Sequence, residues 1–176
     1  MRTVFQEGVM KRKYINGKFV TSTLLRKNSN GDTRTASKDT NYAQFYMSNE
    51  QHKMDVADVI WNLSDTMKAV GGCHDWTKNA YSEKFYDDFM DTLHNGTDFT
   101  KGEWYTMHVE KERHHLLSRC PEDVDLLDVI EMIVDCVCAG KTRSGEVRPL
   151  EISDDILKLA VQNTVKLVDE MTDVVE

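Results

Sequence analysis

The feature that most constrains this fold is the spacing of apolar residues, which repeats at helical intervals along much of the chain. Val56, Val59, Ile60 and Leu63, for example, stand at i, i+3, i+4 and i+7 and form one face of a helix. Proline interrupts helices and glycine weakens them, yet the 176 residues include only two prolines and nine glycines. The sequence therefore predicts an all-α fold rather than a β-sandwich, with a core large enough to need no disulfides.

Capping signals set the expected helix boundaries. Ser48 with Gln51, and Thr100 with Glu103, match the capping box, and Ser153 precedes the last apolar segment as an N-cap. Together with Pro121 at a helix start and glycines after the helix ends, these signals predict about six helices. The first expected helix runs from Ser48 to a turn within 62–68, and a second begins at that turn. Further helices are expected over 79–95, 100–118, 121–140 and the residues after 153.

The first 46 residues differ from the rest of the chain in charge and in pattern. They hold nine Lys and Arg against three Asp and Glu, whereas residues 47–176 hold 13 against 27. Asn16-Gly17 between short runs of β-formers predicts a type I′ hairpin, and Asn28 to Asp32 predicts a loop. We expect residues 1–46 to be a basic arm with a hairpin, not an independent domain, and residues 47–176 to be the helical domain.

Two interpretations of the basic arm remain open. It rests on the acidic helices of the same chain, or it attracts a phosphate-bearing substrate. It lacks regular aromatic interleaving, so nucleic acid is not the expected partner. No apolar run approaches the roughly 18 residues of a membrane span, and the polar N-terminus does not match a signal peptide. Four irregularly placed cysteines indicate reduced thiols, so we expect a cytoplasmic protein without a membrane partner.

Histidines and acids gather in the sequence around His74-Asp75. An imidazole next to a carboxylate can bind one divalent ion of the Zn²⁺, Fe²⁺ or Mn²⁺ type. His52 lies on the apolar face of the first helix, where a hydrogen-bonded core histidine is the alternative. An unbroken helix over residues 48–70 would separate the levels of residues 52 and 71 by about 28 Å. A shared site therefore requires a reversal within 62–68, beside which Gly71-Gly72 would permit close helix packing.

Two later segments carry further candidate ligands. His108 and His115 lie about two turns apart on the predicted helix 100–118, roughly 10 Å along its axis, and a polar surface helix is the alternative. Asp128, Glu131 and Asp135 share a stripe between apolar faces. Because an unpaired buried charge is costly, these carboxylates need partners such as a metal, unless solvent covers them.

The loop predicted for Lys141 to Pro149 is basic and follows directly on the helix that carries Asp135. It could bind phosphate, with Arg143 as the contact, or it could simply be solvated. Cys136 and Cys138 point about 200° apart on a helix, so we interpret them as small core residues rather than a chelate.

In chain order, His52, His74-Asp75 and Asp135 resemble the H…HD…D signature of the HD-domain metal-dependent phosphohydrolase superfamily. With Lys78, the later histidines and Glu131 added, residues 50–140 look most like a family of small uncharacterised HD-like proteins common in phages and bacteria. The resemblance implies an HD-domain-like helical bundle, with the hairpin and the last helix lying outside it. A phage-encoded member would work in the host cytoplasm.

The resemblance also implies roles for single residues. A primary metal would be bound by His52, His74, Asp75 and Asp135. In branches with two ions, Asp75 bridges and His108 with His114 or His115 binds the second. Lys78 would contact the substrate phosphate, with His114 and Arg143 as further candidates. Since related nucleotidases often carry an acid at the place of Lys78, Glu131 is our candidate acid/base beside Asp75.

The implied activity is metal-dependent hydrolysis of a small phosphate ester, with a nucleotide preferred, as in a 5′-nucleotidase or a phosphodiesterase. The implied cofactor is one or two divalent ions, among Mn, Fe, Co, Zn and Mg. Two alternatives remain open: a di-iron oxygenase on the same fold, and a non-enzymatic phage protein that binds a nucleotide or a host partner. A homo-oligomer is compatible with all three.

Overall fold

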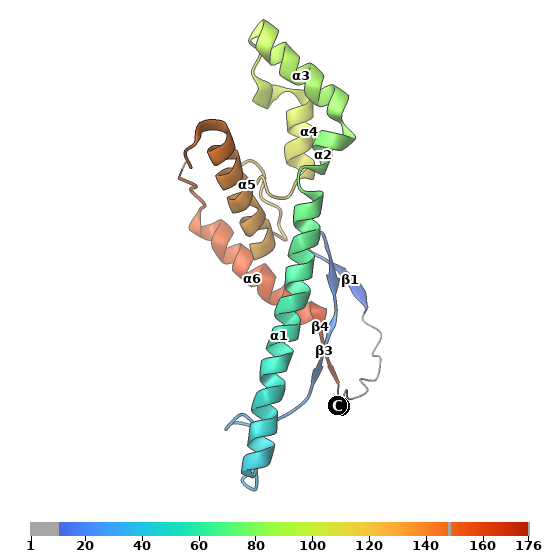
Figure 1. Ribbon diagram of the computed structural model, residues 1–176, viewed down its shortest axis with the longest axis vertical. Coiled ribbons are helices and arrows are strands. Elements are labelled where there is room, and N and C mark those ends of the chain that lie inside the picture. Colours follow the sequence, from blue (N-terminus) through green and yellow to red (C-terminus); the bar gives the residue numbers. More distant parts are fainter. Residues whose placement is uncertain (1–10, 148, 176) are drawn as a thin grey trace. The chain divides into compact units, whose positions relative to one another are not determined.

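The computed structural model describes residues 11–147 and 149–175 and is mostly helical (Figure 1). Its helices are α1 (Tyr42–Cys73), α2 (Trp76–Ala80), α3 (Ser82–Asn95), α4 (Glu103–Lys111), α5 (Leu126–Ser144) and α6 (Asp154–Met171), with a 3₁₀ turn at Phe99–Lys101. Because α2 has only five residues, the described chain holds five full helices rather than the predicted six or so. Residues 1–10 of the predicted basic arm lie outside the described residues.

The chain divides into two compact units. The first contains the described residues up to Lys68 together with those from Val165 onward, and the second runs from Ala69 to Thr164.

The predicted hairpin of the first unit is confirmed. Strands β1 (Arg12–Ile15) and β2 (Lys18–Thr21) pair antiparallel with Ile15 opposite Lys18. Asn16 and Gly17 both have positive φ, 48° and 73°, as a type I′ turn requires. The hairpin is held by its apolar side, because Ile15 and Val20 are buried in one cluster with Leu167 and Met171.

A second strand pair in this unit was not predicted. Strand β3 (Thr23–Arg26) runs parallel to β4 (Thr172–Val175), which joins segments from opposite ends of the sequence (Figure 1). Each strand has four residues and no alternating pattern that could be recognised in the sequence. Such a pairing depends on long-range contacts rather than on local preference.

Helix α1 is continuous from Tyr42 to Cys73, so the predicted reversal within 62–68 is wrong. Ser64, one of the residues that suggested a turn, and the nearby Thr66 bond along the helix instead. Ser64 Oγ donates to the carbonyl of Ile60 at 2.8 Å, and Thr66 Oγ1 to that of Asn62 at 3.0 Å. Side chains that bond back to position i−4 satisfy themselves without ending a helix.

The start of α1 was also misplaced. Asn41 and Gln44 form a reciprocal cap, each backbone N–H donating to the side chain of the other at 3.0 Å, so the helix begins before Ser48.

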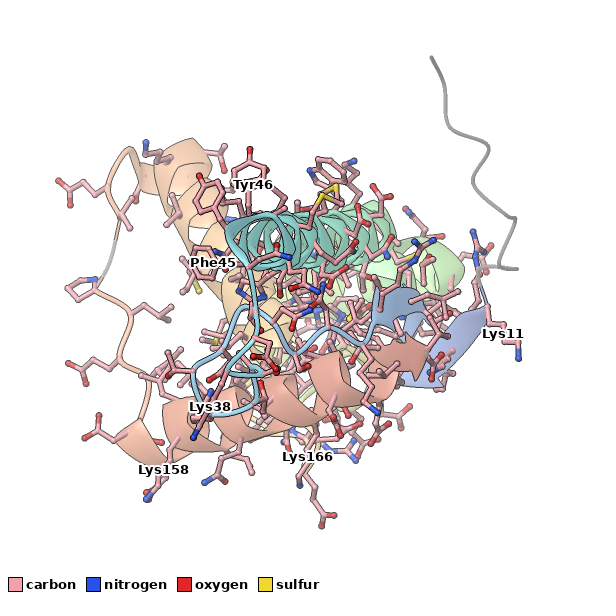
Figure 2. The ribbon with its side chains drawn as sticks, turned by 90° about the horizontal axis from the view of Figure 1, so that it is seen from below. Lys11, Lys38, Phe45, Tyr46, Lys158 and Lys166 are labelled. Atoms are coloured by element: carbon pink, nitrogen blue, oxygen red, sulfur yellow. The ribbon has the colours of Figure 1, made fainter. Side chains whose placement is uncertain are left out.

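His52 is exposed rather than buried on α1. Phe45 and Tyr46 also project from the first turns of α1, while Lys158 and Lys166 project from α6 (Figure 2). No helix of the described residues is long and apolar enough to cross a membrane.

In the second unit, four predicted boundaries need correction. Helix α4 ends at Lys111 rather than near Ser118, and its N-cap is Gly102, while Thr100 lies in the 3₁₀ turn. Helix α5 begins after Asp125, which forms a capping box with Asp128, rather than at Pro121. It continues past Gly140 to Ser144, so the first four residues of the predicted basic loop are helical.

The core of the second unit lies between α5, α6 and the segment before α5. Leu116, Val124, Val129, Met132 and Ala160 are its buried members, and Cys136 packs against them from the edge. Cys138 is exposed, so only one of the two cysteines predicted for the core contacts it. The core anchors Leu116, which follows directly on His114 and His115.

Two glycines provide a matched test of the backbone. Gly71 lies in the last turn of α1 with nothing within 4 Å of an added Cβ, which contradicts the close packing expected there. Gly71→Ala is expected to raise the free energy of unfolding by about 0.5 kcal/mol, because alanine favours the helix. Gly17→Ala, at φ 73°, should lower it by about 1 kcal/mol. Urea unfolding measures both, and a loss of stability in Gly71→Ala would contradict the open surface described here.

Candidate metal centre

The centre is built on the sharp turn between α1 and α2. After Cys73 the helix ends, and His74 and Asp75 form a turn in which Asp75 has φ 56°. This left-handed conformation is uncommon outside glycine and aspartate tolerates it better than most residues. Lys78 lies one turn later, and its Nζ donates to Asp75 Oδ2. The lysine therefore holds one oxygen of Asp75 and leaves the other, Oδ1, directed elsewhere.

Asp75 Oδ1 is buried among imidazoles. It lies 3.5 Å from His108 Nε2 and 3.6 Å from His114 Nε2. Neither this oxygen nor either nitrogen of His114 has a hydrogen-bond partner within the described residues. With His115 these residues form a group whose ligand atoms all lie within 4.8 Å of one another. Unsatisfied buried donors and acceptors are costly, so the arrangement is suited to a bound cation.

The three histidines converge because α4 stops early. Glu112 is in an extended conformation, which ends the helix and directs the next residues into a tight turn. His115 Nε2 consequently lies 2.8 Å from His108 Nε2, and the separation of about 10 Å predicted for a continuous helix is wrong.

A second group of possible ligands lies beside the first. His74, His114 and Asp135 also place one ligand atom each within 4.8 Å, and His74 Nε2 is 3.5 Å from Asp135 Oδ1. Glu131 stands behind them, with its Oε1 3.0 Å from His74 Nδ1 and 3.3 Å from His114 Nδ1. Because a carboxylate accepts the Nδ1–H of His74, the Nε2 of that ring is left to face Asp135.

The electrostatics of the two groups favour a positive ion. Burial, aided by His115, lowers the pKa of His108 to about 4, and burial with His114 does the same for His115. Both rings are therefore neutral near pH 7, as metal ligation requires. Burial would lower the pKa of His114 as well, but Glu131, Asp75 and Asp135 outweigh it and raise that pKa.

Two carboxylates of the centre have lowered pKa values. Burial would raise the pKa of Asp75, but the hydrogen bond and the charge of Lys78 outweigh it and lower that pKa. Burial is likewise outweighed at Glu131, whose pKa is lowered by its close contacts with the His114 and His74 rings and by their charges. Three carboxylates, those of Asp75, Glu131 and Asp135, thus face a single ammonium group. Their charge and the nitrogen and oxygen donors fit a divalent ion of borderline softness.

Aromatic stacking fixes the position of His108 from the other side. Trp104 is 1% exposed and lies almost parallel to the His108 ring, with centroids 4.6 Å apart and an interplanar angle of 14°. Phe85 of α3 stacks on the opposite side of Trp104 at 4.1 Å. Asp88 caps α4 by accepting the Trp104 N–H at 2.9 Å. Helix α3 therefore helps to position a candidate ligand.

The structure brings most of the predicted site residues together, but not all of them. His74, Asp75, Lys78, His108, His114, His115, Glu131 and Asp135 lie around the two groups. His52 lies on α1 in the first unit, and neither group found in the described chain includes it. Its role as a ligand stays a prediction. Arg143 is exposed in the last turn of α5, about 12 Å along the axis from Asp135 by helical rise.

Asp128, predicted to need a partner, has Arg113. The guanidinium donates to Asp128 Oδ1 at 3.0 Å and to Oδ2 at 2.9 Å, and also to Asp123 Oδ1 at 2.9 Å. This pair ties the turn that carries His114 to the start of α5. Sequence reasoning missed Arg113, and it also missed Thr77 and Glu112. Their residue types are common on any protein surface. The only signal in the sequence is their position, Thr77 just after His74-Asp75 and Glu112-Arg113 just before His114-His115.

We expect divalent metals to stabilise the protein through these two groups. Mn²⁺, Co²⁺ or Zn²⁺ at a hundred times its Kd should add about 2.7 kcal/mol, or about 5–10 °C in Tm. His74→Ala and His115→Ala, each removing one partly exposed ligand, should lose most of that shift at the same metal concentration. Calorimetry with and without metal measures the effect.

Two other histidines serve as controls. His94→Ala, at the exposed end of α3, should keep the full metal shift. His52→Ala should keep it too, because neither group found in the described residues contains His52. If His52→Ala abolishes metal binding, the assignment inferred from the resemblance is right and the ligand set described here is incomplete.

Arg113→Ala tests the pair that orients the histidine turn. Its loss leaves a nearly buried carboxylate without its guanidinium, which should cost about 2–4 kcal/mol, less than for a fully buried pair because Arg113 is 25% exposed. Arg34→Ala is the control, since that arginine pairs with Asp32 while 86% exposed, where solvent screens the pair, and its loss should change stability little. If urea unfolding shows the same loss of unfolding free energy in both variants, the Arg113–Asp128 pair contributes no more than an exposed ion pair.

Comparisons with known proteins add a family without an assigned activity. Residues 41–176 match DUF5662, described as a family of unknown function. No curated protein and no solved structure matches the chain.

Proposed function

Because the chain belongs to DUF5662, a family of unknown function, its activity has to be inferred from the site, and we propose that it is a metal-dependent phosphohydrolase. The proposed substrate is a small phosphate ester, with nucleotides as the first candidates. The proposed fold relationship is to the HD-domain superfamily, as the order of His74-Asp75, Lys78 and Asp135 along the chain suggests.

One observation carries the proposal. The buried Asp75 Oδ1, which lacks a hydrogen bond among the described residues, lies among three imidazoles while Oδ2 of the same carboxylate binds Lys78. The carboxylate of Asp75 thus offers one oxygen as a metal ligand and binds the ammonium group of Lys78 with the other. A bound metal ion and this ammonium group would both favour phosphoryl transfer, because negative charge on the phosphoryl oxygens and on the attacking oxygen is stabilised by nearby positive charge.

Two overlapping sets of side chains would bind the metal. Asp75, His108, His114 and His115 would hold one divalent ion, and His74 with Asp135, sharing His114, would hold the same or a second ion. A bound ion would lower the pKa of its water ligand and polarise a phosphoryl oxygen. His114 therefore supports metal binding in this proposal rather than the phosphate contact we first expected.

Lys78 is the group that would meet the substrate. Its side chain is 33% exposed whereas that of Asp75 is 15% exposed, so an anion arriving from solvent can reach the lysine. Glu131 has contacts with His74 and His114, which suit orientation of the imidazoles better than proton transfer to substrate. The acid/base role that we expected for Glu131 is therefore not part of the proposal.

The test is a metal and substrate screen. Metal-stripped protein is reloaded with Mn²⁺, Co²⁺, Fe²⁺, Zn²⁺ or Mg²⁺ and assayed for phosphate release from nucleoside mono-, di- and triphosphates and from a generic ester. His74→Ala and Asp75→Ala should lose metal content and activity together. Hydrolysis that persists in the metal-free double variant would overturn the proposal.

Lys78→Met separates substrate binding from metal binding. It should retain the metal while kcat/KM falls by about 10²–10³, because one charge that stabilises the transition state is lost. Lys84→Met, which removes an exposed lysine paired with Glu103, is the matched control and should leave kcat/KM unchanged. Loss of the metal in Lys78→Met would show that the lysine supports the centre rather than the substrate.

The same screen can identify the two alternatives. Iron retention with a visible absorption band and oxygen uptake would favour the di-iron oxygenase. Tight nucleotide binding without turnover under every metal would favour a binding protein.

A further inference from the structure

Two buried residues next to the candidate centre have no part in the proposed reaction. Thr77 is completely buried in α2, and Glu112, which ends α4, is 6% exposed. Burial of a glutamate costs free energy unless its oxygens accept hydrogen bonds, so Glu112 needs donors close to it. Each residue stands next to a ligand-bearing segment, Thr77 two residues after Asp75 and Glu112 two residues before His114.

Three hydrogen bonds join these residues to His108. Glu112 Oε1 accepts the backbone N–H of Thr77 at 2.9 Å and its hydroxyl at 2.7 Å. Thr77 Oγ1 also lies 2.6 Å from His108 Nδ1. The chain of contacts therefore runs from the carboxylate through the hydroxyl to the imidazole.

The directions of these bonds follow from the number of protons. A threonine hydroxyl has one hydrogen, and it is donated to the carboxylate oxygen, which already acts as acceptor for the backbone N–H. The hydroxyl can then only accept from His108. His108 Nδ1 must carry the proton, and in the neutral ring Nε2 must carry the lone pair.

The lone pair of His108 Nε2 has a definite direction, and without a metal it accepts a hydrogen bond from the His115 ring. His108 Nε2 lies 2.8 Å from His115 Nε2 and 3.5 Å from Asp75 Oδ1, within the first ligand group. Stacking on Trp104 prevents the ring from tilting out of this orientation. The opposite tautomer would place an N–H at this point and block coordination.

We propose that Thr77 and Glu112 are positioning residues that fix His108 in the Nδ1–H tautomer, so that its Nε2 is ready to bind the metal. The inference rests on the proposed metal centre, but its first consequence holds without metal. The same bonds also tie the turn that carries Asp75 to the end of α4, where the chain turns toward His114 and His115.

The first experiment reads the tautomer directly. Metal-free protein labelled with ¹⁵N is examined at neutral pH by long-range ¹⁵N–¹H correlation of the histidine rings, and the His108 signals are assigned by their loss in His108→Gln. Wild type should show a protonated Nδ1 and an unprotonated Nε2. Thr77→Val should shift the ring toward a mixture of tautomers, and Thr77→Ser should restore the wild-type pattern. A wild-type His108 protonated at Nε2 would overturn the proposal.

The second experiment measures affinity for Co²⁺ or Zn²⁺ by competition with a chromophoric chelator. Thr77→Val should weaken binding by about 10–100-fold, while Thr77→Ser stays within about threefold of wild type. Thr66→Val is the control for loss of a buried hydroxyl, since Thr66 Oγ1 bonds only along α1 in the described contacts, and it should bind metal normally. Wild-type affinity in folded Thr77→Val would overturn the proposal.

The two experiments separate this inference from the proposed function. If wild type binds no divalent metal, the phosphohydrolase proposal fails, and the tautomer measurement alone decides the role of Thr77 and Glu112. If wild type binds metal but the tautomer is indifferent to Thr77, the metal centre stands and the positioning role is wrong.

Discussion

The carboxylate of Asp75 is the point on which the candidate centre depends. One of its oxygens is held by Lys78, and the other is buried where His108 and His114 present nitrogens rather than hydrogen bonds. A buried carboxylate oxygen without a donor costs free energy, and so does a cluster of carboxylates with a single ammonium group. A divalent cation would remove both costs at once, which is why the chemistry of the site follows from this one residue.

Backbone conformation delivers the ligands, and each ligand segment is held by a group that is not itself a ligand. Asp75 takes a left-handed conformation immediately after α1, and Glu112 ends α4 in an extended one. Glu112 holds the first turn through Thr77, while Arg113 holds the histidine turn through Asp128. Ordinary surface residue types thus position the unusual ones, and the centre is more rigid than its ligands alone would make it.

The sequence was most reliable where a local preference decided the structure. The Asn16-Gly17 hairpin, the cap at Ser153 and the end of α3 at Gly96 follow from short-range backbone geometry, and all three are present. It failed where a signal had more than one solution. Ser64 looked like a turn residue but bonds within α1, and Thr100 looked like a cap but lies in a 3₁₀ turn. Capping residues are compatible with both outcomes, because their hydroxyls can satisfy either a helix end or a carbonyl one turn back.

The sequence by itself determined which residue types were available for a metal centre: His74-Asp75, the later histidines and the carboxylates of α5. Only the tertiary structure decided how they meet. The early end of α4 at Lys111 brings His115 into contact with His108. Asp128 pairs with Arg113, and Glu131 contacts His74 and His114. The physical reason is that side-chain identity fixes what an atom can bind, whereas the termination of helices and the burial of charges fix which atoms come within reach, and both depend on contacts between residues distant in the chain.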